Sequence, residues 1–93
     1  MGREYKVRFD NPNTPSIDTF LRSLPCFAGF DESWKSYTYY EEDNMNDMPA
    51  AEISIEDEGI YLCDYGMSEH LFGLIVERLI AQFNRVHIED YEV

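Results

Sequence analysis

The chain has few basic residues, two cysteines and no long apolar run, and each scarcity excludes a class of protein. Seven Lys and Arg against 19 Asp and Glu give a formal net charge of -12, which repels nucleic acid and anionic membranes. Direct DNA or RNA binding is not expected, because it requires a basic surface. No stretch has the roughly 18 to 20 apolar residues of a membrane span, and residues 1–9 lack the apolar core of a secretory signal. We expect a cytoplasmic protein.

Motifs for metals, cofactors and phosphates are also missing. Cys26 and Cys63 are expected to be two reduced thiols in that compartment. With His70 and His87 they form neither a CxxC nor an HExxH motif, so no zinc site is predicted. Residues 43–47 are rich in oxygen ligands but lack the glycine and glutamate of a calcium loop. The five glycines are scattered. We therefore predict no metal and no cofactor.

The composition nevertheless predicts a folded chain. Of the 93 residues, 44% are hydrophobic and 15% aromatic, which is too apolar for a disordered acidic tail. A chain of this length is typical of one domain, so we assign residues 1–93 to a single domain.

Residues 68–84 carry the clearest secondary-structure signal. At about 100° per residue, seven apolar residues fall within roughly half the circumference of a helix. They are Leu71, Phe72, Ile75, Val76, Leu79, Ile80 and Phe83. Ser68 is a suitable N-cap, and Glu69 suits the positive end of the helix dipole. Because such a helix is stabilised mainly by packing, it must lie against a sheet or another helix.

Alternating apolar and polar residues predict further strands at 4–10, 51–55, 60–64 and 85–89. The turn at 56–59, which ends in glycine, joins the two middle segments as a hairpin. A short amphipathic helix is predicted from an N-cap at Thr14 to Leu24, where Pro25 stops it.

Two loops flank an aromatic segment. The composition of residues 34–41 predicts a strand with bulky side chains on both faces. Loops are predicted at residues 26–32 and 42–49. The expected order is strand, helix, strand, strand, strand, helix, strand (β-α-β-β-β-α-β). We predict an α+β fold, a two-layer sandwich with two helices on one face of an antiparallel or mixed sheet. A ferredoxin-like topology is one of several alternatives.

The acidic residues are concentrated in the middle of the chain. Between Ser36 and Glu77 there are eleven acidic residues and no lysine or arginine. Such an interval is typical of a solvated surface, but it also suits a basic partner. Arginine pairs with carboxylates and stacks on tyrosine, and the aromatic strand lies beside this interval. The alternative for its tyrosines is a core face with ordinary surface neighbours.

From this pattern we predict a non-catalytic protein-binding module that inhibits or regulates a basic, nucleic-acid-handling protein. The predicted partner-binding residues are Tyr37, Tyr39, Glu41, Glu42, Asp43, Asp47, Glu56, Asp57 and Glu58. Two alternatives remain. One is a small enzyme or ligand-binding domain with a site near Cys63 and His70. The other is a homodimer or larger homo-oligomer joined through an edge strand or an outward face at Gly73 and Leu74.

Overall fold

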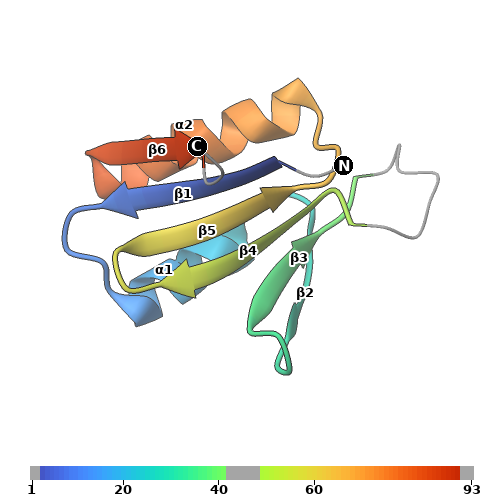
Figure 1. Ribbon diagram of the computed structural model, residues 1–93, viewed down its shortest axis with the longest axis horizontal. Coiled ribbons are helices and arrows are strands. Elements are labelled where there is room, and N and C mark those ends of the chain that lie inside the picture. The colour runs from blue at the N-terminus through green and yellow to red at the C-terminus, as the bar shows by residue number, and fades with distance from the viewer. Residues whose placement is uncertain (1–2, 42–48, 91–93) are drawn as a thin grey trace.

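The computed structural model describes residues 3–41 and 49–90, which form six strands and two helices (Figure 1). In chain order these are β1 (Arg3–Phe9), α1 (Thr14–Ser23), β2 (Phe27–Asp31), β3 (Ser36–Tyr39), β4 (Ala51–Glu56), β5 (Gly59–Asp64), α2 (Glu69–Phe83) and β6 (Val86–Asp90). The strands make one antiparallel sheet in the order β2-β3-β4-β5-β1-β6. The predicted α+β class is confirmed.

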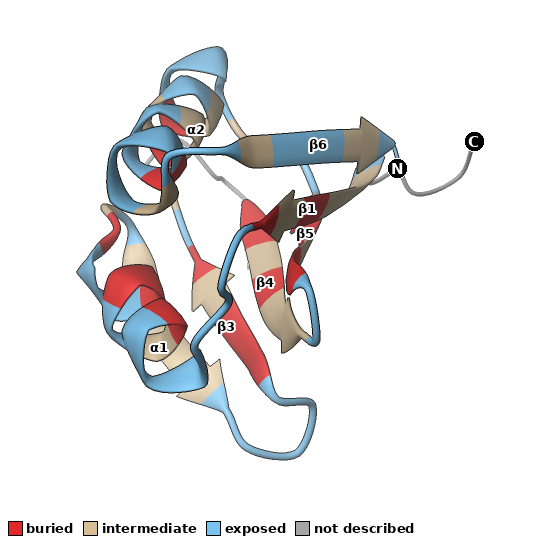
Figure 2. Cartoon of the chain, turned by 90° about the vertical axis from the view of Figure 1, so that its left-hand side faces the viewer, coloured by how far each residue is buried: buried red, intermediate tan, exposed pale blue. Residues whose placement is uncertain are grey.

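Both helices pack on the same face of the sheet (Figure 2). Phe83 of α2 stacks on Phe9 of β1 with ring centroids 4.1 Å apart, and it also meets the edge of Phe20 of α1. One hydrophobic core lies between the layers, with Ile53 and Leu62 buried at the centre of the sheet. Alternate residues of each strand therefore face the helices, and the intervening residues face away from them.

The long helix begins and ends as predicted. Ser68 is its N-cap, and the Ser68 hydroxyl accepts a hydrogen bond from the Leu71 N–H at 3.1 Å. Six of the seven predicted apolar residues are buried or half-buried, but Ile80 is 50% exposed. Its position at the margin of the apolar face explains this error, because the sheet covers less than the full predicted arc. The first helix begins one residue earlier than predicted, with Asn13 as its N-cap.

The predicted hairpin is formed by β4 and β5, and in its register Ile53 lies opposite Leu62 and Ile55 lies opposite Ile60. Gly59 begins β5 and lies directly against β1. A Cβ atom at this position would be 2.0 Å from the Val7 carbonyl oxygen, so the close approach of these two strands requires glycine.

The number of strands differs from the sequence-based prediction. Residues 27–31 form strand β2, whereas a loop was predicted there. The register shifts between Phe27 and Gly29, and such an irregularity adds a residue that breaks the alternating pattern. Phe27 and Phe30, three residues apart, consequently both contact the ring of Tyr37. The signal for this strand was hidden by the irregularity.

The sheet is wholly antiparallel over the described residues. The mixed sheet that was one of the predicted forms is not present in this part of the chain. The ferredoxin-like alternative agrees with the strand order β6-β1-β5-β4, in which β5 lies between the parallel strands β1 and β4, and β1 lies between the parallel strands β5 and β6. These are two split βαβ units, connected through α1 and α2, and β2 and β3 extend the sheet beyond β4. No helix among the described residues has the length and hydrophobicity needed to cross a membrane.

Candidate functional site

The two tyrosines predicted to bind a partner lie in the core. Tyr37 is 3% exposed and Tyr39 is fully buried. The Tyr39 hydroxyl donates to the Leu21 carbonyl of α1 at 2.7 Å, and the Tyr37 hydroxyl donates to the Asp18 carboxylate. The prediction that these side chains form a contact surface is therefore wrong. The helix layer covers their face of β3, which the sequence alone did not indicate because both faces of the segment are aromatic.

The predicted acidic residues do not gather at one place. Glu41 binds the start of α2, where its carboxylate accepts from the Ser68 N–H at 2.8 Å and from the Ser68 hydroxyl at 2.7 Å. Glu56 is half-buried, and Asp57 and Glu58 are exposed, at the far end of β4. A strand of this length separates the two groups by about 17 Å. Glu42, Asp43 and Asp47 lie outside the described residues.

The face of the sheet that the helices leave uncovered carries a different set of polar and aromatic residues. Strand pairing aligns Thr38, Glu52, Cys63 and Glu4 in one row across four strands. The next row contains Ser36, Ser54, Tyr61, Lys6 and Glu89. Directly paired residues of antiparallel strands point to the same side, so all nine belong to this open face.

At the centre of this face, two carboxylates are each held by a tyrosine. The Tyr61 hydroxyl donates a hydrogen bond to the Glu4 carboxylate. Tyr65, just after β5, interacts with both the Cys63 thiol and the Glu52 carboxylate. Trp34, in the turn before β3, is 79% exposed, and Tyr65 is 38% exposed. We call the group of Trp34, Glu4, Glu52, Tyr61, Cys63 and Tyr65 the aromatic–acidic patch.

The two tyrosines of the patch remain protonated at neutral pH. Burial raises the pKa of the Tyr61 phenol above its ordinary value, and its hydrogen bond to Glu4 raises it further. For Tyr65, the hydrogen bond with Cys63 is the main cause of a raised pKa, followed by burial. Both hydroxyls therefore act as neutral donors, and the negative charge of the patch resides on Glu4 and Glu52.

Part of the patch is hollowed. Trp34, Glu52, Tyr61, Cys63 and Tyr65 line a shallow depression of about 270 Å³, together with two serines of the neighbouring strands. Its lining combines three aromatic side chains with the Glu52 carboxylate. A planar cation such as guanidinium matches both, because it stacks on aromatic rings and pairs with carboxylates.

The geometry does not support a catalytic cysteine. Cys63 is buried at the open face, whereas His70 is an exposed residue of α2, which covers the opposite face. The sheet separates the thiol from the imidazole that would activate it. Among the described residues no group of three or more His, Cys, Asp or Glu is arranged to hold a metal ion. Cys26 is exposed and is not joined to Cys63.

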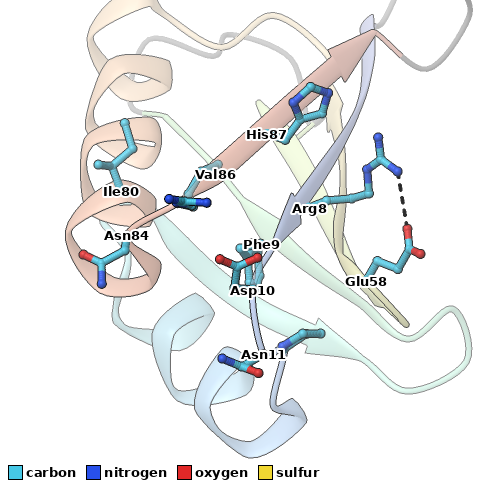
Figure 3. Close-up of a pocket in the computed structure, with 11 residues that line it drawn as sticks. Arg8, Phe9, Asp10, Asn11, Glu58, Ile80, Asn84, Val86 and His87 are labelled. Atoms are coloured by element: carbon cyan, nitrogen blue, oxygen red, sulfur yellow. Dashed lines mark ion pairs between the residues drawn. The ribbon is translucent and has the colours of Figure 1, made fainter.

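A larger hollow, of about 810 Å³, lies at one end of the sheet beside the start of β6 (Figure 3). Ile80 lies on its α2 side, and Arg8 and His87 lie on its sheet side (Figure 3). Charged residues of both signs lie around this hollow, because Arg8 forms ion pairs with Glu58 and Glu89. It therefore lacks the concentration of one charge that distinguishes the aromatic–acidic patch.

Sequence reasoning missed the residues of the patch because distant segments supply them. Glu4 and Tyr61 are 57 residues apart, and only the register of β1 against β5 brings them together. The one available signal was the alternation of apolar and polar residues along each strand. It indicates on which face of the sheet a side chain lies, but not which residues of other strands lie next to it. No family model matches the chain, and searches of curated proteins and of solved structures found no significant match.

Proposed function

We propose that the protein binds a basic partner protein by inserting an arginine side chain of that partner into the aromatic–acidic patch. The observation that carries this proposal is the exposed Trp34 beside Glu52 and Tyr65 on an uncovered sheet face. Tryptophan and tyrosine are enriched at the centres of protein interfaces, where they give a large contact area at low entropic cost.

The charge of the chain supports the class of partner that we propose. A net charge of -12 speeds encounter with basic surfaces, and nucleic-acid-binding proteins carry such surfaces for their own ligand. A nucleic-acid-handling protein is thus the partner class we propose. Occupation of its basic surface would compete with nucleic acid, so the protein would act as an inhibitor or regulator.

The chain provides its own reporter for this proposal, because Trp34 is the only tryptophan. We would titrate the protein with an arginine-only peptide and with a lysine-only peptide of equal length, and follow Trp34 fluorescence. The arginine peptide should bind more tightly and shift the emission, since guanidinium stacks on indole and pairs with carboxylates in a way that a lysine ammonium does not.

Two double variants of equal net charge separate a defined patch from diffuse attraction. The variant Glu4→Gln with Glu52→Gln removes two charges from the patch. The variant Asp57→Asn with Glu77→Gln removes two from exposed positions in the β4–β5 turn and on α2. We expect the first to weaken binding about tenfold or more, as the loss of charge-assisted hydrogen bonds predicts, and the second to change it little. Equal weakening by both, or equal binding of the two peptides, would contradict the proposal.

A further inference from the structure

The sheet has two edge strands, and only one of them is shaped to block further pairing. At one edge, β2 has an irregular register at Phe27 and Gly29, and an irregular edge disfavours the addition of another strand. At the other edge, β6 is regularly paired to β1 over all five residues from Val86 to Asp90. It contains neither proline nor lysine, and no described strand lies on its outer side.

Exposed apolar side chains lie along the same edge. Ile88 of β6 is 37% exposed and Ile80 of α2 is 50% exposed. Ile80 lines the hollow beside Val86 and His87, which places it next to the start of β6 (Figure 3). At about 100° per residue Gly73 and Val76 lie on the same side of α2 as Ile80. Beyond its own stretch of helix, no atom of the described residues lies within 4 Å of a Cβ built on Gly73, so this side of the helix is open to a close neighbour.

The sequence of β6 is complementary to itself in one antiparallel register. If two copies pair about a two-fold axis at Ile88, all five residues of each strand are paired. Ile88 then faces Ile88, each His87 faces Glu89 of the second copy, and each Val86 faces Asp90. On the open face, Glu89 already lies beside Lys6 of β1. The second copy's His87 would occupy its other side, and no acidic residue would face another.

From these features we infer that β6 is the interface of a homodimer, in which two sheets join edge to edge into one continuous antiparallel sheet. An isologous contact of this kind closes on itself, so it does not lead to fibres. The two α2 helices would then meet across the axis through the apolar side that carries Gly73, Val76 and Ile80. The inference is independent of the proposed function, because β6 and the aromatic–acidic patch occupy different parts of the sheet.

The first test is the mass of the protein in solution. Sedimentation equilibrium would be measured from about 10 μM to about 1 mM, because association follows mass action. It would be repeated at about 0.15 M and about 0.5 M salt, because screening weakens the repulsion between two acidic chains. The mass should rise from the 11.0 kDa of one chain towards twice that value. A mass that stays at one chain throughout would overturn the inference.

A pair of charge-matched variants locates the interface. Ile88→Lys places a charge on the proposed axis, and Ala28→Lys places the same charge at an exposed position of β2, the other edge strand. We expect Ile88→Lys to raise the dissociation constant at least tenfold and Ala28→Lys to leave it unchanged. Thermal unfolding of both variants checks that they fold. An equal effect of the two substitutions would contradict an interface at β6.

Cross-linking tests the register. In a Cys26→Ser background, Ile88→Cys should form an intermolecular disulfide on mild oxidation, because directly opposed residues lie about 4.5 to 5.5 Å apart and within disulfide reach. His87→Cys should not cross-link, since residue 87 lies one position off the axis and is therefore diagonal to its own copy, at a distance of about 7 to 8 Å. Cross-linking at position 87 with none at position 88 would exclude the proposed pairing.

Discussion

The hydroxyl of Tyr37 donates a hydrogen bond to the carboxylate of Asp18 over 2.5 Å, and this contact ties strand β3 to helix α1. The same carboxylate accepts from Arg22 Nε at 3.0 Å, and the Arg22 guanidinium lies 5.7 Å from the centre of the Tyr37 ring. The hydrogen bond from Tyr37 is the main cause of a lowered pKa at Asp18, and Arg22 lowers it further. These three residues together form a small polar contact at the margin of the core.

Removal of the Tyr37 hydroxyl should change the pH dependence of the free energy of unfolding in the acidic range. The folded-state pKa of Asp18 is below its ordinary value of 3.8, so its contribution to stability is present above that value and is lost as the pH falls through the folded pKa. In Tyr37→Phe the pKa of Asp18 should rise towards its ordinary value, and this part of the acid dependence should diminish. NMR titration of the Asp18 carboxyl measures the change. Tyr40→Phe, at an exposed position, is the control and should leave the pKa unaltered.

Tyr37 should also make the fold sensitive to alkali. Burial, and then the hydrogen bond to Asp18, raise the pKa of Tyr37 from 10.0 to about 12. Because the folded state favours the protonated phenol, the stabilisation is complete below about pH 10 and is lost as the pH rises through about 12. Urea unfolding between these pH values should show a smaller loss of stability in Tyr37→Phe than in the natural sequence. Identical slopes for the two proteins would contradict this assignment.

Gly59 should be the glycine least tolerant of a side chain. A Cβ at this position would lie 2.0 Å from the Val7 carbonyl oxygen, and a backbone atom in the centre of a sheet cannot move away cheaply. We expect Gly59→Ala to lower the free energy of unfolding by about 2 to 3 kcal/mol. Gly29→Ala is the matched control, since apart from its chain neighbours no atom of the described part of the chain lies within 4 Å of its Cβ position. Its effect should stay within about 0.5 kcal/mol, as measured by urea denaturation.

Glu41 should stabilise the protein rather than bind a partner. Its carboxylate accepts two hydrogen bonds from Ser68 at the N-terminus of α2, where a negative charge also suits the helix dipole. Glu41→Gln should therefore cost about 1 kcal/mol of unfolding free energy, and Ser68→Ala a similar amount. Chemical denaturation measures both. Asp57→Asn serves as the exposed control, and a cost for it equal to that of Glu41→Gln would argue against the capping role.

The sequence predicted the elements that local patterns specify. The apolar spacing and N-cap of α2 lie within a single segment, as does the turn that ends at Gly59 between two alternating strands. The same reasoning failed for β2, where one irregular pairing places Phe27 and Phe30 on the same side. Local periodicity cannot reveal an irregularity that depends on a neighbouring strand.

The candidate site was less predictable than the fold. Tyr37 and Tyr39 were assigned to the surface because an aromatic strand with two bulky faces does not indicate which face the helices cover. Glu41 was assigned to a partner because its contact with Ser68 spans 27 residues. An acidic surface bearing tyrosines does occur on the open face, but Tyr61 and Tyr65 supply its tyrosines. Their position depends on sheet order, which single-sequence patterns do not determine.

The position of β1 in the sheet also governs the order in which the chain can fold. Although β1 precedes the other described strands in the chain, it pairs with β5 and β6, and Tyr5 lies opposite both Leu62 and Asp90. Val7 and Phe9 therefore stay without their strand partners until residues about fifty or more positions later have been translated. Contacts so distant in sequence make folding slow. During synthesis, the apolar face of β1 is the segment most in need of protection from aggregation.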